Sequence, residues 1–224
     1  MTNLFTLTLP LSLTVAVSFD LFDTLVSVPR PEDTPGAIAA ELDARDVPVP
    51  ADWETAGREA AAAIDAAEGE EVSISTYAAR ALASRDVHPE RKAIESAVLA
   101  AFDRPVATRD GALEAVAAAG ARGSVGVLSN CSVSGLVERT LERSAIDTQR
   151  FDAVVSSVDL GWRKPHERAF RAIVSDLDVS VADLTHVGDD PHDDGGASDV
   201  GAMAVLLGDV PLAEFPTYLE ARGV

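Results

Sequence analysis

Carboxylates, hydroxyls and a lysine stand where the sequence predicts strands to end. In chain order these groups are Asp20-Leu21-Phe22-Asp23-Thr24, Ser129-Asn130, Lys164-Pro165 and Gly188-Asp189-Asp190 with Asp194 behind it. Clustered carboxylates are hard oxygen ligands that suit Mg²⁺. A metal offsets their mutual repulsion, so one of them can remain an anionic nucleophile towards a phosphoryl group.

The lysine and the serine have complementary predicted roles. Lys164 is one of only two lysines in the chain, and an ammonium beside the nucleophile would stabilise the carboxylate and the oxygens of a transferring group. The Ser129 hydroxyl, with Asn130 beside it, is predicted to bind a phosphate oxygen of the substrate. Lys164 is expected to contact the substrate as well.

Short apolar segments alternate with helical stripes and would position these groups. We predict strands over residues 14–19, 124–128, 153–157, 184–187 and 203–207, and helices over 111–121, from Val133 to Leu141 and from Phe170 to Leu177. This alternation predicts an α/β fold, a Rossmann-like core with a parallel sheet. Ligands of such sheets bind outside the carboxyl ends of the strands, where the polar groups stand.

Residues 31–105 differ from the rest of the chain, because their apolar residues follow helical spacing and none of their segments has a convincing strand pattern. The four stripes are Ile38/Leu42, Trp53/Ala56/Ala60/Ile64, Ile74/Tyr77/Ala81/Leu82 and Ile94/Val98/Ala101/Phe102. We therefore expect an all-helical subdomain over 31–105, inserted into a core formed by residues 13–30 and 106–224. The acidic stretch 65–71 is predicted to be a loop, and residues 1–12 to precede the fold.

Composition limits the partners and the compartment. The chain has 224 residues, 47% of them apolar, which excludes a disordered chain and fits one domain with an insert. Eighteen basic and 37 acidic residues leave a net charge of −19, which disfavours nucleic acid and anionic membranes as partners. Few lysines and many acids resemble proteins of salt-accumulating archaea, so we interpret the acidity as a halophilic surface. One cysteine, Cys131, and no evident signal peptide predict a cytoplasmic location.

Taken in order, the motifs resemble the haloacid dehalogenase superfamily, in the group with a helical C1-type cap. The matching segments are FDLFDTL, VGVLSN, RKPHERAF and HVGDD. The resemblance implies that Asp20 is the nucleophile, that Thr24, Ser129 and Lys164 assist it, and that Mg²⁺ is the cofactor. It also implies metal binding by Asp20, the Phe22 carbonyl and the acidic strand end Asp189, Asp190 and Asp194.

One position departs from the phosphatases of this superfamily. They usually carry a second Asp two residues after the nucleophile, which protonates the leaving alcohol; here the residue is Phe22, which cannot transfer a proton. Asp23, one residue further on, is the candidate substitute. The acidic fourth motif favours a Mg²⁺-dependent phosphatase that acts on a small phosphorylated metabolite through an aspartyl-phosphate.

The same departure leaves two alternatives open. One is a metal-independent 2-haloacid dehalogenase-like hydrolase, because that group also lacks the second Asp. The other is a catalytically weak protein that binds a phosphometabolite. The implied cap would close over small substrates. Arg58, Arg80 and Arg91 are candidates for reading a phosphate tail, and a monomer or homodimer is expected.

The remaining polar residues receive no chemical role. His166 and His186 are interpreted as ordinary helix and strand residues, and His192 and Asp193 as surface groups. Cys131 is interpreted as a small buried thiol.

Overall fold

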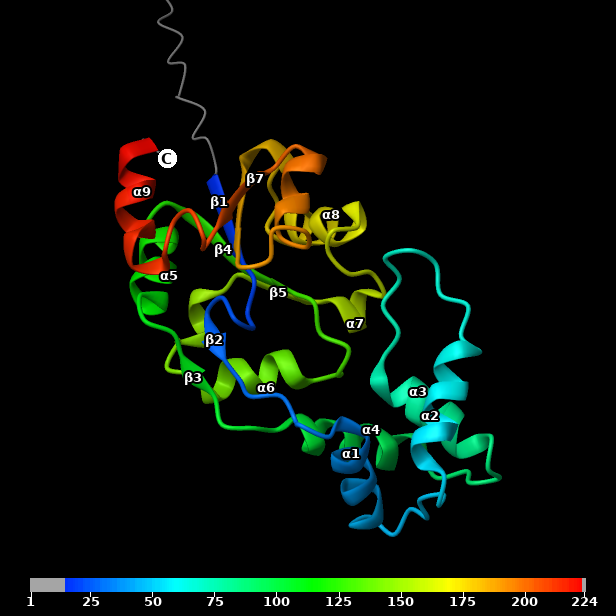
Figure 1. Ribbon diagram of the computed structural model, residues 1–224. Helices are drawn as coiled ribbons and strands as arrows, with labels where there is room; N and C mark the ends of the chain where they lie inside the picture. The colour runs from blue at the N-terminus through cyan, green and yellow to red at the C-terminus, as the bar shows by residue number, and fades with distance from the viewer. Residues whose placement is uncertain (1–14, 223–224) are drawn as a thin grey trace, which may run out of the picture.

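A five-stranded parallel sheet forms the centre of the protein, of which a computed structural model describes residues 15–222 (Figure 1). Its strands, in spatial order, are β5 (Ala153–Ser156), β4 (Gly123–Ser129), β1 (Val15–Phe19), β6 (Leu184–Gly188) and β7 (Met203–Leu206). The α/β class with a parallel sheet is thereby confirmed. The predicted start of the first strand at residue 14, the core boundary at 13 and the interpretation of residues 1–12 lie outside the described residues.

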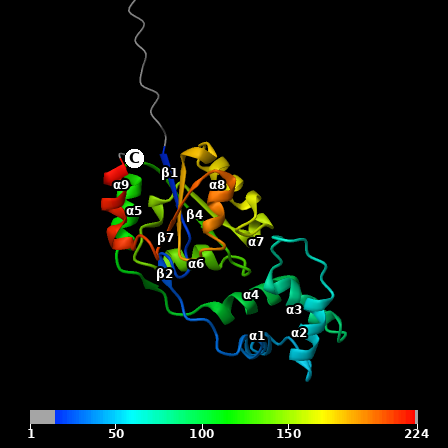
Figure 2. The same cartoon turned by 45° about the horizontal axis from the view of Figure 1, so that its top comes forward.

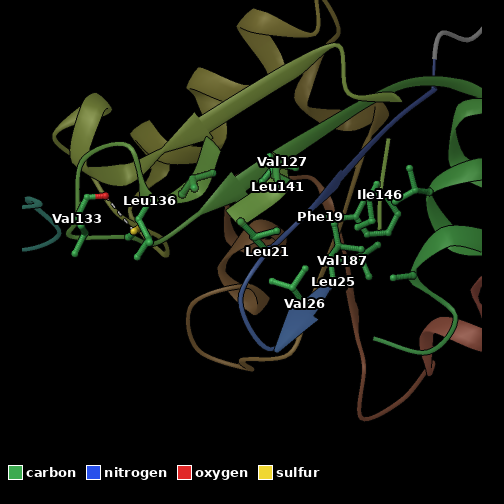
Figure 3. Packing of buried hydrophobic residues seen from close by; sticks show 14 of the residues in the cluster. Phe19, Leu21, Leu25, Val26, Val127, Val133, Leu136, Leu141, Ile146 and Val187 are labelled. Carbon is green, nitrogen blue, oxygen red and sulfur yellow. Dashed lines mark hydrogen bonds between the residues drawn. The ribbon is translucent and has the colours of Figure 1, made fainter. Parts of the chain in front are cut away.

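Helices cover both faces of this sheet, as a buried parallel sheet requires. On one face Val17 and Phe19 pack in a cluster with α5 (Ala112–Gly120), α6 (Leu136–Arg143) and α9 (Phe215–Arg222). Figure 3 shows part of this cluster around Phe19. On the other face Ala16 packs with α8 (Glu167–Asp176). Because successive strand side chains point to opposite faces, β1 anchors both clusters.

Strand register brings the polar strand ends together. Phe19 of β1 lies beside Val127 of β4 and Val187 of β6. The Asp20 backbone N–H also donates to the Val187 carbonyl, at 2.8 Å. The residues that follow these three strands therefore meet at one edge of the sheet.

Four helices follow β1 and lie beyond this edge, away from the end of the chain (Figure 2). They are α1 (Thr34–Asp43), α2 (Trp53–Ala62), α3 (Ile74–Ala83) and α4 (Arg91–Phe102), and we call them the cap. Side-chain caps fix two of their starts: Asp33 accepts from the Gly36 N–H at 2.9 Å, and Ser73 from the Thr76 N–H at 3.1 Å. Within residues 15–222, no helix has the length and apolar character needed to cross a membrane.

Two linkers join the cap to the core as a small antiparallel pair, β2 (Val26–Ser27) and β3 (Ala107–Thr108). Arg109, directly after β3, donates from its backbone N–H to the Leu25 carbonyl and from its guanidinium to the Asp23 carbonyl. The linker that leaves the cap thus supports the loop that follows Asp20.

A third attachment joins the loop between α2 and α3 to the core. The carboxylate of Glu71 in this loop is almost completely buried and accepts hydrogen bonds from Ser132 at 2.7 Å and Ser157 at 2.8 Å. Its backbone N–H donates to the Gly161 carbonyl at 3.0 Å, and the Arg163 guanidinium lies 3.7 Å from its carboxylate. The cap is therefore fixed to the core both at its linkers and at this loop.

Several predicted element bounds need correction. Ile64 lies beyond the end of α2, Val133 precedes α6, and residue 157 begins the short helix α7 (Ser157–Leu160) rather than ending a strand. The strands β2 and β3 and the helices α7 and α9 carry too short or too weak an apolar pattern to be predicted. The acidic stretch 65–71 is a loop as predicted, although Glu71 within it is buried.

Candidate active site

Lys164 is the centre of the polar cluster at the sheet edge. Its ammonium is buried and donates three hydrogen bonds, to Asp20 Oδ1 at 2.8 Å, to Asp194 Oδ1 at 2.6 Å and to the Leu128 carbonyl at 2.7 Å. An ammonium has three donors, so all of them are used. Lys164 thus links the predicted nucleophile to the acidic segment after β6 and to the carboxyl end of β4.

Burial and charged neighbours together shift the pKa values of Asp20, Asp194 and Lys164. Burial raises the pKa of Asp20 to about 6; the Lys164 ammonium opposes the rise, and Asp194 and Asp189 add to it. Burial would also raise the pKa of Asp194, but hydrogen bonds from His186 and Lys164 hold that pKa well below its usual range. Burial alone would lower the pKa of Lys164, yet Asp20 and Asp194 outweigh it and leave the pKa raised. Lys164 and Asp194 therefore remain a charged pair at neutral pH.

His186 belongs to this cluster, so its interpretation as an ordinary strand residue is wrong. One ring nitrogen lies 3.0 Å from Asp194 Oδ1, and the other lies 2.7 Å from the hydroxyl of Ser18. The β1–β6 register places Ser18 directly beside His186. Burial and the neighbouring Lys164 ammonium lower the pKa of His186, so a neutral imidazole bridges Ser18 and Asp194.

Three carboxylates form a candidate metal site. One oxygen from each of Asp20, Asp189 and Asp194 lies within 4.8 Å of the others. Thr24 is buried and donates its hydroxyl to Asp189 Oδ1 at 3.1 Å, which orients that carboxylate. Partial burial raises the pKa of Asp189, as expected for a carboxylate near others. An all-oxygen set with this repulsion fits a hard divalent cation such as Mg²⁺.

Asp190 stands apart from this group of three. Its Oδ1 accepts from the backbone N–H groups of His192, at 2.7 Å, and Asp193, at 2.9 Å. Its own N–H donates to Asp194 Oδ2 at 2.9 Å. Asp190 thus shapes the turn that brings Asp194 back towards Lys164, and its carboxylate does not join the Asp20 cluster.

Asn130 holds the lysine segment in place. Its side-chain oxygen accepts from the Lys164 N–H at 2.8 Å, and its Nδ2 donates to the Lys164 carbonyl at 2.9 Å. The same Nδ2 donates to Asp193 Oδ2, also at 2.9 Å. Asp193, interpreted from the sequence as a surface group, therefore contributes to the site by holding Asn130.

Ser129 ends β4 with an unpartnered hydroxyl. Its Oγ is buried and, within the described residues, has no hydrogen-bond partner. Ser156 at the end of β5 carries the same unpartnered buried hydroxyl. Ser129 is not among the residues that line the two cavities described below, so the predicted contact between Ser129 and a substrate phosphate stays a prediction.

The loop after Asp20 places Phe22 and Asp23 at the mouth of the site. Asp23 has a positive φ of 62°, a left-handed conformation that aspartate tolerates better than most residues. Its N–H donates to the Val26 carbonyl at 2.7 Å, and Arg109 holds its carbonyl. The Asp23 side chain is exposed and lines the cavity beside Asp20.

Two adjoining cavities meet at this loop. The nucleophile cavity measures about 160 Å³ and is lined by residues that include Asp20, Lys164, Asp189 and Asp194. The cap cavity measures about 370 Å³ and lies between the cap and the core. Both are lined by Phe22, Asp23, Arg30, Asn130 and Arg163.

The arginines of these cavities differ from those predicted. Arg30 in the first linker and Arg163 beside Lys164 line both cavities, whereas, among the residues described, Arg58, Arg80 and Arg91 line neither. Arg163 has a visible signal in the sequence, because it directly precedes the rare lysine. Arg30 has none, because only the path of the linker brings it to the site.

Comparison with known proteins identifies the family. The family model for haloacid dehalogenase-like hydrolases matches residues 14–201. A comparison with curated protein sequences finds no match.

Several solved structures share the fold. A 2-haloacid dehalogenase from Pseudomonas syringae is 21% identical with a TM-score of 0.65, covering 94% of this chain and 100% of its own. A predicted phosphoglycolate phosphatase from Haemophilus somnus is 18% identical with a TM-score of 0.56, covering 95% and 99%. An L-2-haloacid dehalogenase from Xanthobacter autotrophicus is 19% identical with a TM-score of 0.54, covering 94% and 84%. The sheet, the inserted cap and the family match together show that this chain belongs to the haloacid dehalogenase-like hydrolases.

Proposed function

We propose that this hydrolase is a Mg²⁺-dependent phosphatase that acts on a small phosphorylated metabolite through an aspartyl-phosphate. The observation that carries the proposal is the cluster of Asp20, Asp189 and Asp194 around one point. Asp194 and Asp189 raise the pKa of Asp20 and oppose an anionic substrate, and a bound cation would offset both effects. Asp20, Asp189, Asp194 and the Phe22 carbonyl would hold the ion, which when bound neutralises the charge of these groups and of the phosphate.

Four residues of the site have separate roles in the proposed reaction. Asp20 attacks phosphorus with its free carboxylate oxygen, while its Oδ1 stays hydrogen-bonded to Lys164. Lys164 balances the negative charge on Asp20 and on the phosphoryl oxygens as the bond forms. Asn130 keeps Lys164 in place, and the buried, unpartnered Ser129 hydroxyl is the predicted donor to a phosphoryl oxygen.

Asp23 is our candidate for moving the proton of the second step. It is exposed and lines the nucleophile cavity together with Asp189, and its charge contributes to the raised pKa of Asp189. In this role Asp23 accepts a proton from the water that hydrolyses the aspartyl-phosphate.

The second candidate function is metal-independent dehalogenation, and Phe22 is the observation that favours it. Halide needs no proton on leaving, so an apolar residue at this position would carry no penalty. Two of the structurally similar proteins reported above are haloacid dehalogenases by name. A catalytically weak phosphometabolite-binding protein is the third reading, consistent with the same missing acid.

The deciding experiment is phosphate release from 4-nitrophenyl phosphate with Mg²⁺ or with EDTA. We expect Mg²⁺-dependent release that Asp20→Asn abolishes while its circular dichroism spectrum stays unchanged. Halide release from a 2-haloacid that persists in EDTA would instead establish the dehalogenase. A matched control is Asp43→Asn at the end of α1, which should leave either activity unchanged.

A further inference from the structure

The cap cavity is continuous with the nucleophile cavity and offers room for the leaving group of the substrate. The two share five lining residues, among them Phe22 and Asn130. A phosphate monoester that Asp20 attacks in line must therefore direct its ester oxygen, and the group which that oxygen carries, away from Asp20, towards the cap cavity or towards solvent.

Apolar side chains dominate the wall of the cap cavity away from this junction. They are Val28, Ile74, Phe102, Val133 and Leu136. Val28, Ile74 and Phe102 pack against the main core yet remain only half-buried, so part of their apolar surface faces the cavity. An apolar cavity of about 150 Å³ is enough to bind benzene in another protein. The cavity here, at about 370 Å³, has room for a substituted aromatic ring.

Phe22 also restricts the leaving group of the substrate, because it cannot donate a proton. Without an acid at this position, the ester oxygen must leave as an anion. A phenolic oxygen does so readily, because phenols have a pKa of about 10, whereas an unactivated hydroxyl such as that of water has a pKa of about 15.7. Both the shape of the cavity and the missing proton donor therefore favour an aromatic leaving group.

We propose that the cap cavity binds the aromatic group of an aryl phosphate monoester, which is the substrate class of this enzyme; this inference rests on the proposed phosphatase function. The Asp20 carboxylate oxygen forms a bond to phosphorus, and the bond between phosphorus and the aryl oxygen breaks. The electron pair leaves with that oxygen, and the resulting phenolate takes its proton from solvent. Water then attacks phosphorus, releases inorganic phosphate and restores the Asp20 carboxylate.

Two arginines at the junction suit this substrate. Among the described residues Arg30 has no hydrogen-bond or ion-pair partner, and Arg163 is exposed beyond its contact with Glu71. With Lys164 they are the positive charges of the nucleophile cavity, and they attract a phosphate dianion towards its carboxylates. A guanidinium also binds the face of an aromatic ring favourably.

The test compares phenyl phosphate with cyclohexyl phosphate, which matches it in size but leaves as an alkoxide. Because general acid catalysis contributes about 10²–10⁴ in rate, we expect kcat/KM for the phenyl ester to exceed that for the cyclohexyl ester by about 100-fold or more. Phe22→Asp should narrow this ratio at least tenfold by accelerating the cyclohexyl ester. Equal efficiency on the two esters in the wild-type enzyme would overturn the inference and leave the phosphatase function standing. Phosphate release from neither ester, in folded protein with Mg²⁺, would overturn both.

A second arm tests the cavity itself. Phe102→Ala should raise KM for phenyl phosphate about tenfold, the effect of losing an aromatic contact, while inhibition by inorganic phosphate stays the same. Leu113→Ala is the matched control, because Leu113 is an exposed apolar residue on α5, far from the cavity lining. An unchanged KM in folded Phe102→Ala protein would contradict the assigned binding site. Ile74→Ala provides the same comparison should Phe102→Ala not fold.

Discussion

Replacing Lys164 by methionine tests whether this lysine holds the two buried carboxylates together. The variant keeps a long unbranched side chain, one atom shorter, but removes the charge and three hydrogen bonds, to Asp20, Asp194 and the Leu128 carbonyl. Removing one partner of a buried ion pair costs about 3–5 kcal/mol, because the other charge stays buried without compensation. A protein of this size loses about 2–4 °C of unfolding temperature for each kcal/mol, so we expect a fall of about 6–20 °C.

The assay is thermal unfolding at fixed ionic strength, followed by far-ultraviolet circular dichroism. Lys92→Met is the matched control, since the only other lysine of the chain is exposed on α4 and should be silent. Adding Asp194→Asn to Lys164→Met should restore part of the lost stability, because one of the two unbalanced charges is gone. A fall below about 2 °C in the single variant, or strictly additive losses in the double variant, would refute the reasoning.

Three further predictions concern the surroundings of the site. Glu71→Gln should lower the free energy of unfolding by about 2 kcal/mol and speed hydrogen exchange over residues 66–74, because charged hydrogen bonds are lost; Glu68→Gln, at an exposed position of the same loop whose side chain makes no hydrogen bond among the described residues, should do neither. Gly188→Ala should abolish hydrolysis and destabilise the fold by about 1–3 kcal/mol, measured by urea unfolding, since the added Cβ would lie 2.0 Å from Asp194 Cγ. Burial raises the pKa of Cys131 to about 11, so alkylation by iodoacetamide at pH 8 should be about 100-fold slower than for a cysteine with a pKa of 9 and should accelerate about tenfold per pH unit up to about pH 11; fast labelling at pH 8 would contradict this.

Much of the fold and of the site could be predicted because the signals are local. Each of the five parallel strands is a short apolar run that ends at polar residues, and the rule for the carboxyl ends of parallel strands then places Asp20, Lys164 and Asp189 near one another. The structure brings these residues together with Asp194, which the sequence also predicts for the site.

What the sequence did not reveal depends on contacts between distant segments. His186 looks like any residue of a buried strand until the β1–β6 register pairs it with Ser18 and the turn after β6 returns Asp194 to it. Glu71 lies in an acidic stretch whose composition indicates an exposed loop. Its carboxylate is nevertheless buried and accepts hydrogen bonds from two serine hydroxyls of the core. Neither contact leaves a periodic pattern in the chain, so neither was open to prediction from spacing.

The attachment of Glu71 has a consequence for how ligands come and go. Two linkers alone would let the cap swing about β2 and β3, and the site would open as wide as the swing. With the α2–α3 loop bonded to the core beside Arg163, such a swing first requires two serine hydrogen bonds and a buried carboxylate to separate. Ligands small enough for the existing opening can then enter and leave without this separation. Larger ligands can exchange only after the α2–α3 loop separates from the core, so the rate of that separation limits their turnover.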